Sequence, residues 1–255
     1  SEMFSMNFAR SPEMLDEMRP VFELFDAVNV LCWVRRQDQY MTSIRVQTVK
    51  HGGKAIPSKD TLKRFPPDAN YFRITQMIAE KIPNAHLVPH IYDRSQNLLA
   101  QFLTAADLDS SLADGVTLAS VNSSVSGEMY LYQTRLNALA AGSDERMDPL
   151  HAILLKAWAT LAPAVQWSPA IPMTIAERRI IVEHFRESNA KLCRKYGFDP
   201  SLLTPDAATL EVIPDSVSDQ FRSQLTEALF SLRHDTSAAE FEKLIALVEA
   251  ERRSG

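Results

Sequence analysis

The run Val-Asn-Val-Leu-Cys-Trp-Val occupies residues 28–34 and is followed at once by Arg-Arg-Gln-Asp at residues 35–38. The run is almost wholly apolar and rich in β-branched residues, a pattern typical of a strand that is covered on both faces of a parallel sheet. A second short strand is expected at 86–92, where Pro89 places it near a sheet edge. The sequence therefore predicts a buried parallel strand that ends directly before an arginine pair.

Apolar residues recur at helical spacing on both sides of this strand. In the first 92 residues, expected helices at 12–25, 38–50 and 71–82 alternate with the two strands, which is the order of an α/β layer. Further helices are expected at 96–106, 127–141, 147–163, 174–196, 216–233 and 237–252. We therefore expect an α/β fold with a large, mainly helical C-terminal half, divided into a main domain (1–235) and a C-terminal amphipathic helix (236–255).

The composition is that of a soluble globular protein, with 45% hydrophobic and 23% charged residues in a chain of 255. The net charge of −5 argues against duplex nucleic acid as a partner, because such binding depends on many basic contacts to phosphate. No apolar run approaches the roughly 20 residues that span a bilayer. Cys32 and Cys193 lack metal-binding spacing, so we expect reduced thiols, no metal and a cytoplasmic location.

Arg35 and Ser43 are the candidate ligand-binding residues on spacing alone. An arginine at the carboxyl end of a buried strand points into the crevice where open α/β sheets bind ligands. Ser43 lies about one and a half turns into the following helix and can face the same crevice. Together with N–H groups at the helix start, the two side chains would form a phosphate cradle. In the alternative reading, Arg35 pairs with a surface carboxylate and Ser43 is an ordinary helical residue.

Residues 30–43, Val-Leu-Cys-Trp-Val-Arg-Arg-Gln-Asp-Gln-Tyr-Met-Thr-Ser, resemble the 3′-phosphate-binding motif of the P-loop-fold sulfotransferases. A set of bacterial sulfotransferase-like proteins is more similar still, since it shares Arg-Arg-Gln-Asp, the serine and a string like Val-Lys-His-Gly at 49–52. Strings at 89–94, 122–126 and 185–192 also resemble that set, in the same order. The resemblance implies the parallel-sheet, P-loop-containing nucleotide hydrolase-like fold.

The same resemblance implies an activity, namely transfer of a sulfuryl group from 3′-phosphoadenosine 5′-phosphosulfate (PAPS) to a hydroxyl or amine without a metal. The acceptor would be a glycan or a small hydroxylated molecule, and Arg35 and Ser43 would hold the 3′-phosphate of PAPS. The acceptor must lose a proton to a base. The resemblance places that base at Glu2, for which a solvated terminal carboxylate is an equal reading, and His51 is the competing candidate because it follows the helix that bears Ser43.

Four further residues are candidate ligand contacts. Asn122 and Ser124 fall where the related bacterial proteins carry a loop that touches donor or acceptor, although a helix-capping turn explains them more economically. Lys50 and Lys54, with other basic residues up to 64, could line a channel for an anionic substrate, and a solvated loop explains them as well.

The resemblance lacks one element, the loop Gly-x-x-Lys-Thr-Gly-Thr-Thr that would cradle the 5′-phosphosulfate, and the chain contains only seven glycines. We expect the first strand and this loop to precede residue 1, so that the fragment alone has little activity. Two alternatives remain. One is a non-catalytic nucleotide- or glycan-binding module of the same fold, and the other is a helical interaction protein that docks through 216–233 and 237–252. The sequence is also compatible with an oligomer of this chain.

Overall fold

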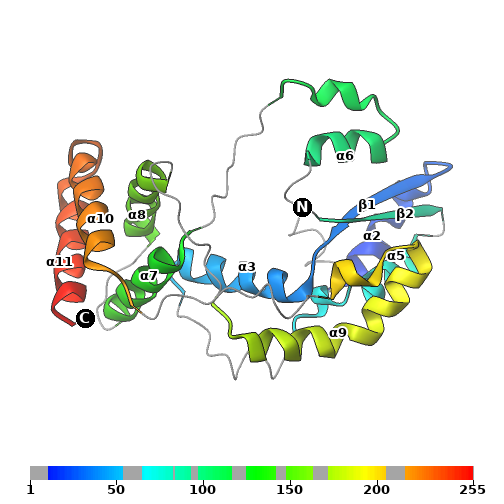
Figure 1. The fold of residues 1–255 in the computed structure, drawn as a ribbon. Coiled ribbons are helices and arrows are strands. Elements are labelled where there is room, and N and C mark those ends of the chain that lie inside the picture. Colours follow the sequence, from blue (N-terminus) through cyan, green and yellow to red (C-terminus); the bar gives the residue numbers. More distant parts are fainter. Residues whose placement is uncertain are drawn as a thin grey trace. The chain divides into compact units, whose positions relative to one another are not determined.

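A computed structural model describes residues 11–53, 65–82, 84–92, 97–116, 125–141, 148–162, 172–204 and 216–254 (Figure 1). The two strands are β1 (Val28–Val34) and β2 (Ala85–Ile91). The α-helices are α2 (Glu13–Phe22), α3 (Gln37–Lys50), α5 (Tyr71–Lys81), α6 (Leu98–Ala105), α7 (Gly127–Ala140), α8 (Asp148–Leu161), α9 (Ile175–Tyr196), α10 (Asp219–Ser231) and α11 (Ala238–Ser254). Short 3₁₀ turns are η1 (Pro67–Ala69), η2 (Ser110–Ala113), η4 (Pro200–Leu203) and η6 (Arg233–Asp235). The expected strands and helices therefore form within a few residues of their predicted bounds.

The chain divides into two compact units. The first comprises Ser1–Tyr40, Lys59–Ala119 and Ala176–Thr209, and the second comprises Met41–Ser58, Ser120–Ile175 and Leu210–Gly255. The division runs through α3, whose first four residues belong to the first unit and whose remainder belongs to the second. No described helix is both long and apolar enough to cross a membrane.

The first unit contains the sheet, in which β1 and β2 run parallel from the pair Val28 and Ala85 to the pair Val34 and Ile91. Apolar side chains of α2 and α5, among them the fully buried Leu15, cover the first part of one sheet face. Side chains of α9 and η4 pack against the strand ends Val34 and Ile91. The helices therefore bury one face of the sheet and position its carboxyl end.

The second unit has a helical core. Buried side chains of α7, α8, α10 and α11 pack together with Val49 of α3, and the largest of them are Trp158, Tyr132 and Phe221. The Phe221 ring centroid lies 5.9 Å from that of Tyr132 and 6.3 Å from that of Trp158. The apolar faces of α10 and α11 are thus buried in the core of their own unit.

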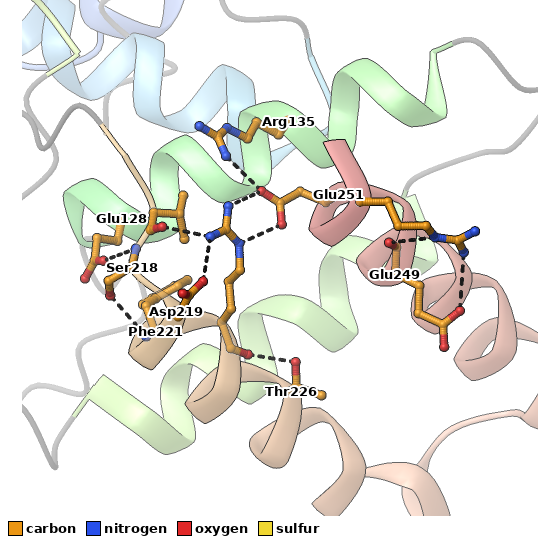
Figure 2. Close-up of polar contacts among 11 residues, drawn as sticks. Glu128, Arg135, Ser218, Asp219, Phe221, Thr226, Glu249 and Glu251 are labelled. Atoms are coloured by element: carbon orange, nitrogen blue, oxygen red, sulfur yellow. Dashed lines mark hydrogen bonds and ion pairs between the residues drawn. The ribbon is translucent and has the colours of Figure 1, made fainter. Parts of the chain in front are cut away.

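A buried carboxylate joins three helices of the second unit (Figure 2). Glu251 on α11 is 1% exposed and accepts a bidentate pair of hydrogen bonds from Arg222 on α10, both at 3.1 Å. Arg135 on α7 donates a third at 3.0 Å. Burial alone would raise the pKa of Glu251, but the hydrogen bonds and charges of the two arginines outweigh it and lower that pKa.

The predicted parallel-sheet, P-loop-containing nucleotide hydrolase-like fold is wrong. The described residues are mostly helical, and their strands form one two-stranded sheet instead of a layer of several parallel strands. The α-β-α-α-β order of the first 92 residues is real, but every described element of five or more residues after β2 is an α-helix. Two short strands cannot form the extended sheet, covered by helices on both faces, that an α/β layer requires.

Candidate functional site

The Arg-Arg-Gln-Asp motif lies at the carboxyl edge of the sheet. β1 ends at Val34, Arg35 and Arg36 form the connection, and α3 begins at Gln37. Because β2 runs parallel to β1, its own carboxyl end reaches the same edge, where the Tyr92 N–H donates a hydrogen bond of 2.8 Å to the Val34 carbonyl. The motif therefore adjoins the ends of both strands and the start of a 14-residue helix.

Arg35 is half-buried and lies against both neighbouring elements. Its guanidinium carbon is 5.5 Å from the centre of the Tyr92 ring, and its Nε donates to Gln39 Oε1 at 3.4 Å. The first distance is within the range of a cation–π contact. Arg35 is thus held at the sheet edge by an aromatic ring from beyond β2 and an amide from the first turns of α3.

The next charged residues of the motif form a buried ion-pair network. Asp38 is fully buried and accepts two hydrogen bonds of 2.9 Å from Arg36. Arg178 on α9, itself 5% exposed, donates two more to Asp38 Oδ2 at 2.8 and 2.6 Å. Burial alone would raise the pKa of Asp38, but the two guanidinium groups outweigh it and hold the pKa below its ordinary value. Asp38 is therefore a carboxylate at neutral pH and joins α3 to α9.

Gln37 makes a second connection between the same two helices. Gln37 and Asn189 are both buried and exchange reciprocal amide hydrogen bonds of 2.7 and 2.9 Å. Gln37 Nε2 also lies 3.3 Å from the Ala69 carbonyl of η1. Three of the four motif residues thus anchor the first turn of α3, and the fourth, Arg35, lies at the sheet edge.

Sequence reasoning missed Arg178, Asn189 and a buried carboxylate at Asp68. Asp68 in η1 is 2% exposed and accepts a hydrogen bond from the Tyr40 hydroxyl. Its other oxygen, Oδ1, has no hydrogen-bond partner among the described residues. A signal existed for Asn189 alone, because it lies in the 185–192 string that resembles the same bacterial proteins as the Arg-Arg-Gln-Asp string.

The other predicted site residues are placed differently. Ser43 is half-buried in the part of α3 that belongs to the second unit, and His51 is exposed directly after that helix. Lys50, the predicted channel residue at the end of α3, is 7% exposed, and burial lowers its pKa. The remaining predicted residues lie outside the described residues: Glu2, Lys54, Asn122 and Ser124.

The cysteines and potential metal ligands give no second site in the described part of the chain. Cys32 and Cys193 are unpaired, and burial raises the pKa of the Cys32 thiol to about 11, so this thiol is protonated at neutral pH. The described residues bring no three His, Cys, Asp or Glu side chains together as a metal-binding cluster.

No family model matches the chain, and no solved structure matches it. An uncharacterized protein of Archaeoglobus fulgidus is 28% identical over 181 residues, which cover 66% of this chain. The match covers 45% of the archaeal protein, so the chain spans less than half the length of this relative. The match with an uncharacterized protein therefore assigns no function to this chain.

Proposed function

We propose that this chain is a sulfotransferase that uses PAPS, and that the carboxyl edge of β1 holds the 3′-phosphate of the donor. The observation that supports the proposal is the position of Arg35, which directly follows β1 and stacks on Tyr92 at the end of β2. A guanidinium group in this place can donate two parallel hydrogen bonds to phosphate oxygens. The acceptor is a glycan or a small hydroxylated molecule, and the proposed compartment is the cytoplasm.

The charges at the start of α3 also favour an anion. The positive end of the helix dipole attracts phosphate, whereas Asp38 in the first turn would repel it. Arg36 and Arg178 both pair with Asp38, so two positive charges balance one negative charge and leave a surplus. Arg35 adds a further positive charge at the sheet edge. Asp68, which accepts a hydrogen bond from Tyr40 in the first turn of α3, adds a second carboxyl group, so among these side chains three arginines outnumber two carboxyl groups.

In the proposed reaction, an acceptor oxygen attacks the sulfur atom of PAPS while the bond from sulfur to the 5′-phosphate oxygen breaks. Adenosine 3′,5′-bisphosphate leaves with the bonding electron pair, and the proton of the acceptor passes to a base. Arg35 would hold the donor at its 3′-phosphate, remote from sulfur, and so orient it for in-line attack. The second phosphate contact at Ser43 and the candidate bases Glu2 and His51 stay predictions from the sequence alone.

A thermal-shift experiment tests the Arg35 assignment. Adenosine 3′,5′-bisphosphate at 100 times its Kd should stabilise the native chain by about 2.7 kcal/mol, and adenosine 5′-monophosphate should stabilise it less because it lacks the 3′-phosphate. Arg35→Ala should weaken binding of the bisphosphate about 10-fold to 100-fold, since a hydrogen bond to a charged group contributes about 1.5–3 kcal/mol. Arg179→Ala removes an exposed arginine from α9 in the same unit and is the matched control.

Equal shifts with the bisphosphate and the monophosphate, or an Arg35→Ala variant that binds like Arg179→Ala, would refute the assignment. A radiolabelled-PAPS assay then tests catalysis. Specific binding of the bisphosphate without transfer to any glycan acceptor would support the alternative of a non-catalytic nucleotide-binding module. The third alternative, docking through the C-terminal helices, has less support because α10 and α11 bury their apolar faces in their own unit.

A further inference from the structure

The outer edge of β1 is defined by the register of the sheet. The Val28 N–H donates to the Asn84 carbonyl at 3.0 Å, and the Val34 carbonyl accepts from Tyr92 at 2.8 Å. The N–H and C=O groups of one strand residue point to the same edge of the strand, and those of the next residue point to the other edge. The even-numbered residues of β1 therefore bond to β2. The N–H and C=O groups of Asn29, Leu31 and Trp33 point to the opposite edge.

The two outer edges of the sheet differ. On β2 the residues whose backbone groups point outward are 85, 87, 89 and 91, and one of them is Pro89. Proline has no N–H, so the β2 edge cannot continue a hydrogen-bonded ladder. The β1 edge contains no proline and no charged residue, and no strand among the described residues pairs with it. Native proteins usually protect such an edge, which otherwise adds another strand.

The charges at the two ends of β1 indicate the direction of an added strand. Asp26 is exposed two residues before β1, and Arg35 and Arg36 follow its last residue. A second β1 laid antiparallel would place the acidic end of each strand beside the basic end of the other. A parallel arrangement would bring like charges together, which is unfavourable for cross-strand neighbours.

We propose that the chain forms a symmetric homodimer through antiparallel pairing of β1 with β1 of a second copy, which gives a four-stranded sheet in the order β2-β1-β1-β2. The register centred on Leu31 uses all three outward-pointing residues, because each Leu31 lies opposite its counterpart and each Asn29 lies opposite Trp33. It also brings Asp26 of each copy to the same end of the interface as Arg35 of the other. This is an isologous interface with two-fold symmetry. It extends the sheet beyond two strands, which are marginal alone. The dimer does not require that the sheet edge binds a donor, although both proposals use Arg35.

Light scattering on the full chain, with charge variants at Leu31, tests the interface. The unmodified chain should dissociate from dimer to monomer on dilution. Leu31→Lys places two lysines directly opposite each other and should weaken dimerisation at least 10-fold, and Leu31→Glu should do the same. An equimolar mixture of the two variants should recover the dimer, because the opposed side chains then attract each other. Val88→Lys is the matched control, since Val88 pairs with Leu31 in register but lies on β2.

Amide hydrogen exchange on the unmodified chain provides a test that requires no variant to fold. The amides of Asn29, Leu31 and Trp33 should be protected at concentrations where the dimer forms and should exchange at least 10-fold faster on dilution. A monomer at all concentrations, a dimer that Leu31→Lys does not weaken, or protection that dilution leaves unchanged would each overturn the proposal.

Discussion

The buried ion pair between Asp38 and Arg178 should contribute more to the stability of the first unit than any exposed pair on the same helix. The substitution Arg178→Met keeps the length of the side chain and removes its charge. It deletes the two hydrogen bonds of 2.8 and 2.6 Å to Asp38 Oδ2 and leaves the two that Arg36 donates. The fully buried carboxylate therefore loses both of the hydrogen bonds that Arg178 donates to it from α9.

The expected loss follows from these contacts. At about 1.5–3 kcal/mol for each hydrogen bond to a charged group, two lost bonds set an upper limit of about 6 kcal/mol. Removing one partner of a buried ion pair costs about 3–5 kcal/mol when the other charge is left uncompensated. Because Arg36 still compensates Asp38, we expect a decrease of about 3 kcal/mol in the free energy of unfolding.

Urea denaturation followed by circular dichroism measures this loss. If the free energy of unfolding falls by about 3 kcal/mol for each molar of urea, the midpoint of the transition should shift by about 1 M to lower urea concentration. The matched control is Arg186→Met, because Arg186 lies on the same helix and pairs with Glu183 while both side chains are about two-thirds exposed. The control should change stability by less than about 0.5 kcal/mol. Equal losses in the two variants, or a loss below about 1 kcal/mol for Arg178→Met, would refute the reasoning.

Three further predictions concern the same buried groups and the second core. Folding lowers the pKa values of Asp38 and Glu251, so in acid the unfolded chain binds more protons than the folded chain. The stability that these two carboxylates provide above about pH 4 should therefore be lost as the pH falls below about 4. In acid titrations of unfolding, Asp38→Asn should reduce this pH dependence. In a double-mutant cycle followed by urea denaturation, Asn189→Ala and Gln37→Ala should each lower the free energy of unfolding by about 1–3 kcal/mol. The double variant should lose less than the sum of the two single losses, and strict additivity would contradict the reciprocal amide pair. Phe221→Ala should cost about 3–5 kcal/mol in thermal unfolding, and a loss below about 1 kcal/mol would contradict its place in the core.

Local patterns predicted the elements of this chain well. The β-branched apolar run at 28–34 predicted β1, and helical periodicity predicted α3, α7 and α9 within a few residues of their bounds. These signals depend on neighbours close in sequence, which a single chain displays directly. The same patterns predicted an α/β layer, and the resemblance predicted a P-loop fold. Both predictions were wrong, because neither signal states how many strands of this chain form one sheet.

The anchoring of the candidate site could not be predicted in the same way. Asp38 lies 140 residues from its partner Arg178, and Gln37 lies 152 residues from Asn189. Hydrophobic periodicity contains no information on such pairs, since their contact depends on how α9 returns to the start of α3. Lys50 illustrates the same limit, because its charge suggested exposure and packing in the second unit buries it.

The sequence by itself determined where the strands and helices form and placed an arginine pair directly after β1, because backbone preference and side-chain periodicity act over a few residues. Only the tertiary structure decided that Arg36, Gln37 and Asp38 serve to anchor α3, leaving Arg35 beside Tyr92 at the sheet edge. The physical reason is that a buried charge or amide must find a partner, and folding supplies that partner from a distant part of the chain.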